Sequence, residues 1–439
     1  MRIMHVWALV GMTILVLFLS EEASFAYHLQ AEIDNAEKGE VIHIPSGIYE
    51  GSFIIDKPVT LIGDGEVAIV NKSGDYALFI KSDDVHVHNL TIVHENDQLD
   101  LSAVRIEGNR NVLSDITLHT NGMGIVLNAA NQNILRNLSI EGAFRDSEFT
   151  GSMLTREGNG IDLFRSNENV IENVKIQYVQ DGVYIEQSEK NTIRDSYVAH
   201  SRYGFHFMFT KRSHVLNNIS EHNIAGAMVM GTIGTNLQNN QFRKQSFHVH
   251  SQGLMLYDVH HATVLNNVLE ENLTGLYIES STNNQIHGNV VYANYIGLNV
   301  VRSQDNQISY NDFINNQISA RAKDSYENIV RHNFWDEYKG LDITGEKISA
   351  IPYHADLIFP SIVTNKPAFQ LFADSPGLMF LQFVLDVDRT QTLTDEAPLM
   401  NASQLLASVR FEMKRSDMVI YSFAMIISLI LMYVGGRKS

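Results

Sequence analysis

The sequence has no cysteine and far fewer basic than acidic residues. With no cysteine among 439 residues, disulfides, zinc–thiolate sites and thiol catalysis are excluded. Histidine, methionine and the carboxylates remain as possible metal ligands. Against 50 aspartates and glutamates there are 32 lysines and arginines, a formal net charge of -18. Because phosphate binding needs a basic surface, this charge argues against a nucleic-acid partner, and we expect most of it on a solvated acidic face.

A repeat of about 22 residues runs through most of the chain. Each unit opens on a glycine or another small residue and continues with alternating apolar positions, rich in β-branched residues, which predicts short strands and not helices. One unit is too small to bury its own apolar face, so the units must stack into a parallel β-helix. Three longer spacings predict loop insertions: one between Tyr76 and Ser102, and two at 141–157 and 243–252. The units open at Ser102, Gly124, Gly160, Gly182, Gly204, Gly226, Gly253, Gly275 and Gly297.

Asparagines recur at two fixed places in the unit. One column contains Asn111, Asn133, Asn169 and Asn191, and a second, four residues later in the unit, contains Asn137, Asn173, Asn217, Asn239 and Asn266. Asparagine at a recurring turn tolerates left-handed geometry and can hydrogen-bond to its stacked copy. We therefore predict internal or turn ladders here, and no ligand site.

The N-terminus resembles a targeting segment followed by a cap. Residues 1–26 have a short positive start, an apolar run and a small-x-small motif ending at Ala26, which predicts a cleaved signal peptide, with an uncleaved anchor as the alternative. We assign residues 27–345 to the β-helix and expect a short helix at Gln30–Lys38 to cover its first strand edge.

The C-terminal part differs from the repeat. Residues 346–416 have no asparagine column, contain several prolines and carry large apolar clusters, so we expect a partly helical segment that docks on a membrane partner. Residues 417–436 contain a 17-residue uncharged apolar run, Met418–Val434, which predicts one transmembrane helix, with a buried core helix as the alternative. A cleaved signal and this helix together place the body outside the cytoplasm.

Histidine and methionine replace the ordinary surface residues in three consecutive units. Positions one and three after each glycine are apolar and point inward, so positions two and four point outward. Stacked strands lie about 4.8 Å apart, so these outward side chains form one compact patch. Thioethers and imidazole favour a soft ion, and copper(I) is the natural candidate. The predicted metal ligands are His206, Met208, Met228, Met230 and Met255, with His248 and His250 in the insertion before Gly253.

Other functions remain open for this face. A methionine stripe also suits an adaptable protein-docking surface, or it can be surface without a role. Outward Tyr184, Tyr257 and Tyr277 would suit a glycan-binding module. A polysaccharide lyase or epimerase needs carboxylate-bound calcium or a basic residue in a groove. The outward acids Asp162, Glu186 and Glu279 do not cluster with a basic residue within one unit.

The C-terminal stretch adds a resemblance. The segment PYHADLIFPSIVTNKPAFQLFADSPGL and the motif APLM at 397–400, after an asparagine-rich β-helix, resemble the NosD family. That resemblance implies a right-handed β-helix and a non-catalytic, extracytoplasmic accessory role. It further implies copper supply to the copper–sulfur centre of nitrous oxide reductase, with an ABC transporter membrane subunit and the reductase or a copper chaperone as partners. We carry metal handling over only to the histidines and methionines named above. The predicted membrane helix departs from the soluble members of the family.

Overall fold

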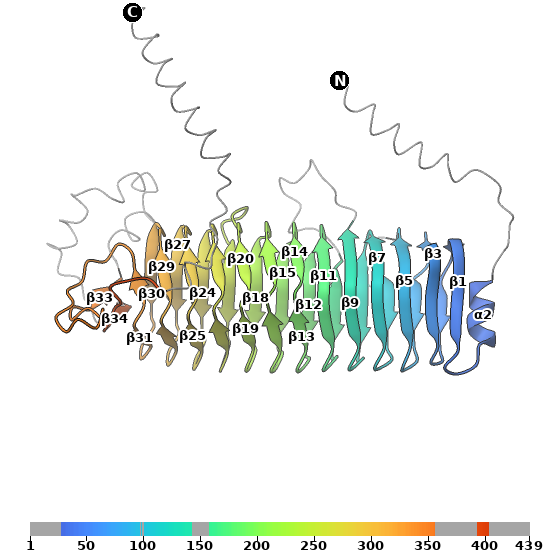
Figure 1. The fold of residues 1–439 in the computed structure, drawn as a ribbon, viewed down its shortest axis with the longest axis horizontal. Helices are drawn as coiled ribbons and strands as arrows, with labels where there is room; N and C mark the ends of the chain where they lie inside the picture. The colour runs from blue at the N-terminus through green and yellow to red at the C-terminus, as the bar shows by residue number, and fades with distance from the viewer. Residues whose placement is uncertain (1–27, 97, 99–100, 143–157, 356–392, 404–439) are drawn as a thin grey trace, which may run out of the picture. The chain divides into compact units, whose positions relative to one another are not determined.

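The structure is a computed structural model that describes residues 28–96, 98, 101–142, 158–355 and 393–403. The chain divides into two compact units, Met1–Thr235 and Asn236–Ser439, and each is described by itself. Both units are stacks of short parallel strands (Figure 1). The predicted parallel β-solenoid with coils of about 22 residues is confirmed.

In the first unit, one sheet takes a single strand from each coil. Neighbouring strands pair in parallel and in register, so that Val183 lies beside Phe205, and Phe205 beside Ala227. Equivalent side chains of successive coils therefore form columns. The strands are β2 (Phe53–Ile55), β4 (Tyr76–Ile80), β6 (Ser102–Ile106), β8 (Met123–Asn128), β10 (Ile161–Phe164), β12 (Asp181–Glu186), β15 (Tyr203–Met208) and β18 (Ala225–Met230).

The other strands of the first unit form the opposing wall. Later coils have two short strands where earlier coils have one long strand. The residue at the bend has positive φ in both cases, as Asn173 (51°) within β11 (Val170–Gln177) and Asp195 (53°) in a later coil show. The long strands are β1 (Val41–Glu50), β3 (Thr60–Asn71), β5 (His86–His94), β7 (Val112–Thr120), β9 (Ile134–Gly142) and β11 (Val170–Gln177). The short strands are β13 (Thr192–Arg194), β14 (Tyr197–Ala199), β16 (His214–Leu216) and β17 (Ile219–Glu221).

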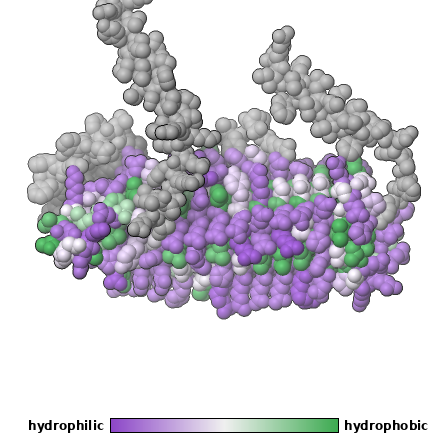
Figure 2. All heavy atoms as spheres, viewed as in Figure 1, coloured by the Kyte–Doolittle hydropathy of each residue, from purple (hydrophilic) through white to green (hydrophobic). Residues whose placement is uncertain are grey.

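The core lies between these walls, and the predicted inward positions fill it. Ile161, Leu163, Val183, Ile185, Phe205, Phe207, Ala227 and Val229 are all buried to 1% exposure or less. The opening glycine of each coil is needed because stacked coils approach closely. A Cβ on Gly182 would lie 2.3 Å from Cγ1 of Val198 and 2.6 Å from the carbonyl oxygen of Gly204. Hydrophilic residues dominate the face in view in Figure 2, as expected for a solvated exterior.

Both asparagine columns form ladders, as predicted. Oδ1 of Asn169 accepts hydrogen bonds from the backbone N–H (2.8 Å) and Nδ2 (3.0 Å) of Asn133, and Asn191 does the same for Asn169. In the exposed column, Asn173 has φ of 51° and its Nδ2 donates to Oδ1 of Asn137 at 2.8 Å. The rungs of the buried column satisfy backbone N–H groups at a corner that no strand ladder can reach.

A short helix covers the first strand edge, close to the predicted place. Helix α2 spans Leu29–Asn35 and buries Leu29 and Ile33. Its Gln30 side chain accepts from the backbone N–H of Ile54 (2.8 Å) and donates to the carbonyl of Ile54 (3.0 Å). The helix thereby caps the edge strand β2, which would otherwise invite pairing with another chain.

The second unit repeats the same architecture. Its single-strand sheet contains β21 (Gln252–Tyr257), β24 (Thr274–Glu279), β27 (Ile296–Val301) and β30 (Ile318–Lys323). The opposing wall contains β19 (Asn236–Gln238), β20 (Gln241–Arg243), β22 (Thr263–Leu265), β23 (Val268–Glu270), β25 (Gln285–His287), β26 (Val290–Tyr292), β28 (Gln307–Ser309), β29 (Asp312–Ile314), β31 (Ile329–Arg331) and β32 (Phe334–Trp335).

Residues 393–403 return to close the last coil of the second unit. Strand β34 (Thr394–Asp395) pairs antiparallel with β33 (Tyr353–His354). Oδ2 of Asp395 accepts from the backbone N–H and Nδ2 of Asn333, both at 2.9 Å, and from Nε1 of Trp335 at 3.1 Å. Asp395 thus takes the place of the next asparagine in the ladder. Trp335 stacks between Phe313 and Tyr353, each at 4.2 Å between ring centroids.

Several predictions fall outside the described residues. The signal peptide (1–26), most of the docking segment (346–416) and the transmembrane helix (417–436) are among them. Within the ranges that the structure describes, no helix is long and apolar enough to cross a membrane.

Candidate metal centre

The predicted ligands of the first unit share one outward face. Strand register places His206 beside Met228, and Met208 beside Met230. On the other side of β15, the neighbours of His206 and Met208 are Tyr184 and Glu186. Met208, Met228 and Met230 are half-buried, while the residues between them are fully buried. The predicted phase of the strands is therefore correct in these coils.

His206 is held by a buried ion pair. Its side chain belongs to the outward row but is only 7% exposed. Nδ1 of His206 lies 2.7 Å from Oδ2 of Asp181. The guanidinium of Arg202 donates to both oxygens of the same carboxylate, from Nε at 2.8 Å and from Nη2 at 2.7 Å. This bidentate pair fixes the carboxylate, and the carboxylate fixes the plane of the imidazole.

The other ring nitrogen of His206, Nε2, is buried. Among the described residues no hydrogen-bond partner lies within reach of it. The rings of Tyr184 and Tyr203 flank the imidazole at 4.9 and 5.1 Å between centroids. In the neutral form of the ring, with Nδ1 donating its proton to Asp181, the imidazole presents a lone pair at Nε2. An unsatisfied buried nitrogen is costly, and a bound ligand would remove that cost.

Ion pairing sets the charge of this cluster. Burial raises the pKa of the Asp181 carboxyl, but hydrogen bonds from His206 and Arg202 outweigh burial and hold the pKa below its usual range. Burial lowers the pKa of Arg202, but the hydrogen bond and charge of the Asp181 carboxylate raise it by more. The pKa of Arg202 is therefore raised overall, and the guanidinium stays charged. The carboxylate beside His206 is therefore anionic at neutral pH.

A second carboxyl in the cluster behaves differently. Burial raises the pKa of Asp162 to about 6, against a hydrogen bond from Asn159, and the nearby charges of Glu186 and Asp181 add to the rise. Asp162 is 8% exposed and Nδ2 of Asn159 donates to it at 2.8 Å. The cluster thus combines a carboxylate held ionised with a carboxyl that takes up a proton near neutral pH.

Tyr184 connects the acidic side of the cluster to Met208. The Tyr184 hydroxyl lies 2.8 Å from Oε2 of Glu186 and 3.2 Å from Sδ of Met208. Its single proton goes to the carboxylate, the stronger acceptor. Burial raises the pKa of Tyr184, and the Glu186 charge raises it further, so the phenol stays neutral. Met208 is therefore packed against a polar pair, while Met228 lies directly beside His206.

The donor set fits a soft ion better than a hard one. No group of three or more histidine, aspartate and glutamate side chains that could hold a metal is found in the described ranges. The donors that the strand register brings together are one imidazole nitrogen and the thioethers of Met208, Met228 and Met230. Such a set suits copper(I) and disfavours calcium, magnesium or zinc.

The remaining predicted ligands belong to the second unit. Met255 is half-buried on β21 and lies beside Tyr277. His248 and His250 stand on the loop before β21, with ring centroids 5.2 Å apart. The backbone N–H of His250 donates to Nδ1 of His248 at 3.2 Å, which leaves Nε2 of His248 as its outward nitrogen. The role of these three residues as ligands stays a prediction.

The outward tyrosines are weaker glycan platforms than the sequence suggests. Tyr184 and Tyr277 are half-buried, and each donates its hydroxyl to the glutamate two residues later. Of the three, Tyr257 is the exposed one, at 37%. A platform for an extended glycan chain would need several exposed rings in register, which Tyr184, Tyr257 and Tyr277 do not provide.

The sequence argument missed Asp181, Arg202 and Tyr203. All three stand just before a coil-opening glycine, where no alternation indicates the direction of a side chain. The usable signal was a carboxylate directly before Gly182, one coil ahead of His206. Basic residues also meet the outward acids from neighbouring coils, as Arg302 does with Glu279. The sequence comparison of the outward acids with basic residues was limited to single coils. Stacking brings basic partners from neighbouring coils.

Residues 143–354 match the family model described as "Periplasmic copper-binding protein (NosD)". The chain carries a NosD-family region. The NosD match spans all seven predicted metal ligands. It ends before most of the C-terminal stretch that suggested the resemblance, so the coils themselves carry the family pattern. No curated protein matches the chain.

Similar solved structures share the fold of this chain. A mannuronan C-5 epimerase module from Azotobacter vinelandii (AlgE6 A-module) has 12% identity and a TM-score of 0.57, covering 69% of this chain and 94% of its own. A family 28 exopolygalacturonase from Yersinia enterocolitica has 10% identity and a TM-score of 0.54, covering 69% of this chain and 75% of its own. At such identities the likeness concerns the fold alone.

Proposed function

We propose that this chain is an extracytoplasmic copper-binding accessory protein that holds copper(I) on the outer face of its solenoid. The observation that carries the proposal is the buried, unpartnered Nε2 of His206 on the face where Met208, Met228 and Met230 lie. The family description, a periplasmic copper-binding protein, supports the same metal.

The residues around His206 would prepare it as a ligand. Asp181 holds the proton on Nδ1 and leaves the Nε2 lone pair for the metal, an arrangement that raises ligand basicity. Thioethers bind copper(I) without charge and without cross-linking, which suits a protein that must release its cargo. His206 and Met228 form the centre of the proposed site, because they are direct strand neighbours.

Met208 and Met230 extend the site, and Met255, His248 and His250 remain proposed contributors from the second unit. In this proposal copper passes to the maturing copper–sulfur centre of nitrous oxide reductase. The partners would be an ABC transporter membrane subunit and the reductase or a copper chaperone. A signal peptide at 1–26 and a membrane helix at 417–436 would tether the body outside the cytoplasm. Isolation of the tethered protein from native membranes, with identification of what accompanies it, tests these partners.

A copper(I) titration of the purified full chain against a chromophoric chelator tests the metal site. Met228→Leu and Met230→Leu keep side-chain size and remove the thioether, and each should weaken copper(I) binding roughly tenfold or more. The matched control is Met123→Leu, a half-buried methionine on β8 of the same sheet, which should bind as the wild type does. Failure of the wild type to compete with the chelator, or equal affinity in all three variants, would refute the proposal.

A carbohydrate-active enzyme is the second candidate, and one observation favours it. The Asp181–His206 pair with a free Nε2, beside an Asp162 carboxyl of raised pKa, is also a plausible general base and acid. The two structural neighbours named above are an epimerase and a polygalacturonase. Incubation with mannuronan and with polygalacturonate separates the candidates: new uronic-acid products that disappear in His206→Gln would favour the enzyme.

A further inference from the structure

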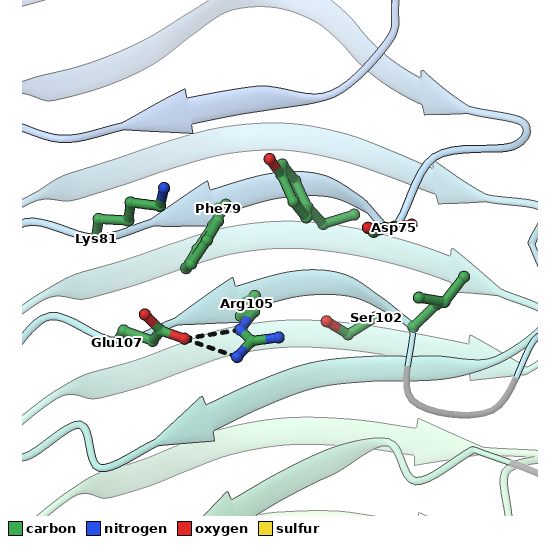
Figure 3. Close-up of a pocket in the computed structure, with 8 residues that line it drawn as sticks. Asp75, Phe79, Lys81, Ser102, Arg105 and Glu107 are labelled. Carbon is green, nitrogen blue, oxygen red and sulfur yellow. Dashed lines mark hydrogen bonds and ion pairs between the residues drawn. The ribbon is translucent and has the colours of Figure 1, made fainter.

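A second cavity opens on the same outward face, nearer the N-terminus. It has a volume of about 400 Å³ and lies over β4 and β6. Strands β8, β10 and β12 separate β6 from the strand that carries His206, so the two sites lie roughly 19 Å apart at 4.8 Å per strand. Figure 3 shows the cavity, which is lined by Asp75, Tyr76, Phe79, Lys81, Leu101, Ser102, Arg105 and Glu107.

An aromatic ring forms the middle of this cavity. The ring of Phe79 is held edge-on by Tyr76, at 5.1 Å between centroids. Two cations lie against it: Nζ of Lys81 at 4.7 Å and Cζ of Arg105 at 5.4 Å from the ring centroid. Phe79 is only 9% exposed, because both cations lie over its ring, attracted by the negative face. Its flat apolar surface becomes available when Lys81 moves off the ring.

The two cations keep unused hydrogen-bond donors. Arg105 donates from Nε (3.0 Å) and Nη2 (2.7 Å) to the same oxygen of Glu107, and no other acceptor meets its Nη1 among the described residues. In the same ranges Nζ of Lys81 has no carboxylate partner, only the ring of Phe79. Lys81 is exposed and flexible, so its ammonium can leave the ring to meet an anion.

Acceptors stand at the other end of the cavity. Asp75 and Ser102 lie there, away from Lys81 and Glu107 (Figure 3). The formal charges of Lys81 and Arg105 balance those of Asp75 and Glu107, so the cavity does not favour a multiply charged anion such as a phosphate ester. It offers one anion-binding end, one flat apolar surface and one end that accepts hydrogen bonds from hydroxyls.

We propose that this cavity binds a sugar acid, a hydroxylated ring that bears one carboxylate. The carboxylate meets Lys81 and Nη1 of Arg105, the C–H face of the ring packs on Phe79, and hydroxyls donate to Asp75. A volume of about 400 Å³ holds one or two such rings, since small-ligand sites begin at roughly 300 Å³. The proposal does not depend on copper binding, because none of these residues belongs to the metal site.

Titration of the purified full chain with galacturonate and glucuronate, followed by saturation-transfer NMR, tests the proposal. We expect roughly millimolar binding of at least one acid, and about tenfold weaker binding of galactose and glucose, which lack the carboxylate. Lys81→Gln should weaken acid binding about tenfold. Phe79→Leu should weaken the acid and the neutral sugar alike, because it removes the flat surface that both use.

The control is Lys175→Gln, which removes an exposed lysine from β11 on the opposing wall and should leave binding unchanged. Lys81→Gln replaces an exposed side chain and does not threaten the fold, so the test does not depend on the Phe79 variant. No saturation by either acid, equal binding of acids and neutral sugars, or equal loss in Lys81→Gln and Lys175→Gln would each overturn the proposal.

Discussion

Asp181 accepts a hydrogen bond from Nδ1 of His206 at 2.7 Å, and both residues are buried. The two belong to successive coils, 25 residues apart in sequence. Stacking therefore builds a carboxylate–imidazole pair that neither coil contains alone. The pair leaves Nε2 without a partner and gives the outward methionines a nitrogen donor of fixed tautomer.

Asp181→Asn should weaken copper(I) binding roughly 10- to 100-fold, because the amide no longer orients and polarises the imidazole. Chelator competition measures the affinity, and 15N chemical shifts of His206 report its tautomer, which a purely structural role would leave unchanged. The variant also leaves Arg202 without its counter-charge, so we expect about 3 kcal/mol lower stability in urea unfolding. Asp195→Asn, at an exposed turn, is the matched control and should change neither quantity.

Asp162→Asn should stabilise the protein above pH 6. The folded pKa of about 6 lies above the ordinary 3.8, so this group costs no stability below about pH 3.8. Its cost grows as pH rises to about 6 and is constant beyond. The asparagine side chain does not ionise and therefore lacks this cost. We expect the free energy of unfolding to rise by up to about 3 kcal/mol at pH 7.5, and this increase to diminish towards pH 4. Urea unfolding at pH 4, 6 and 7.5 measures it, and a gain that does not vary with pH would contradict the assignment.

The repeat and its inward columns could be predicted because they depend on local spacing. A glycine such as Gly182 is required where coils touch, and an asparagine such as Asn169 bonds its own copy one coil away, so both recur at the period of the fold. The phase of Met208, Met228 and Met230 followed from the same alternation. The helix at Leu29–Asn35 was expected because an open strand edge needs a cover.

The contacts that could not be predicted join residues outside the alternation. Asp181 is the first residue of β12, and Arg202 directly precedes β15. At this corner the backbone direction, and not the period, decides where a side chain points. Asp395 lies 62 residues after Asn333, and an aspartate there does not continue an asparagine column in sequence. Both depend on geometry that only the stacked chain defines.

His94 should make the first unit sensitive to acid. Both ring nitrogens are buried without a partner, and burial lowers its pKa below the ordinary 6.5. Near pH 6.5 the unfolded chain therefore binds a proton at His94 that the folded chain does not bind. The free energy of unfolding falls as pH drops below that value.

His94→Leu fills a similar volume without polar atoms and should remove this contribution. We expect the stability advantage of the variant over the wild type to grow as pH falls from 8 to 5. Urea unfolding at pH 8, 6.5 and 5 measures the difference. His86→Gln, at an exposed position on the same strand, is the control. An unchanged difference across this range would show that His94 does not titrate as its burial requires.

Asp395 should be replaceable by asparagine but not by alanine. Its Oδ2 accepts the backbone and side-chain N–H groups of Asn333 and the indole N–H of Trp335, all of them buried. Asp395→Ala leaves these donors unsatisfied and should lower the free energy of unfolding by roughly 3 kcal/mol or more. Asp395→Asn supplies an amide oxygen in the same place, as Asn333 does when its Oδ1 accepts from Asn311 at 2.9 Å. We therefore expect the free energy of unfolding to change by no more than about 1 kcal/mol.

Urea unfolding followed by Trp335 fluorescence measures both variants, because this indole stacks on Phe313 and Tyr353 at the end of the coil stack. Since a terminal coil contacts a neighbour on one side only, loss of its cap should appear first as local opening. Limited proteolysis should therefore cut Asp395→Ala near residues 393–403 faster than it cuts the wild type or Asp395→Asn. Equal stability and equal cutting rates for the two variants would mean that the ladder does not end on this carboxylate.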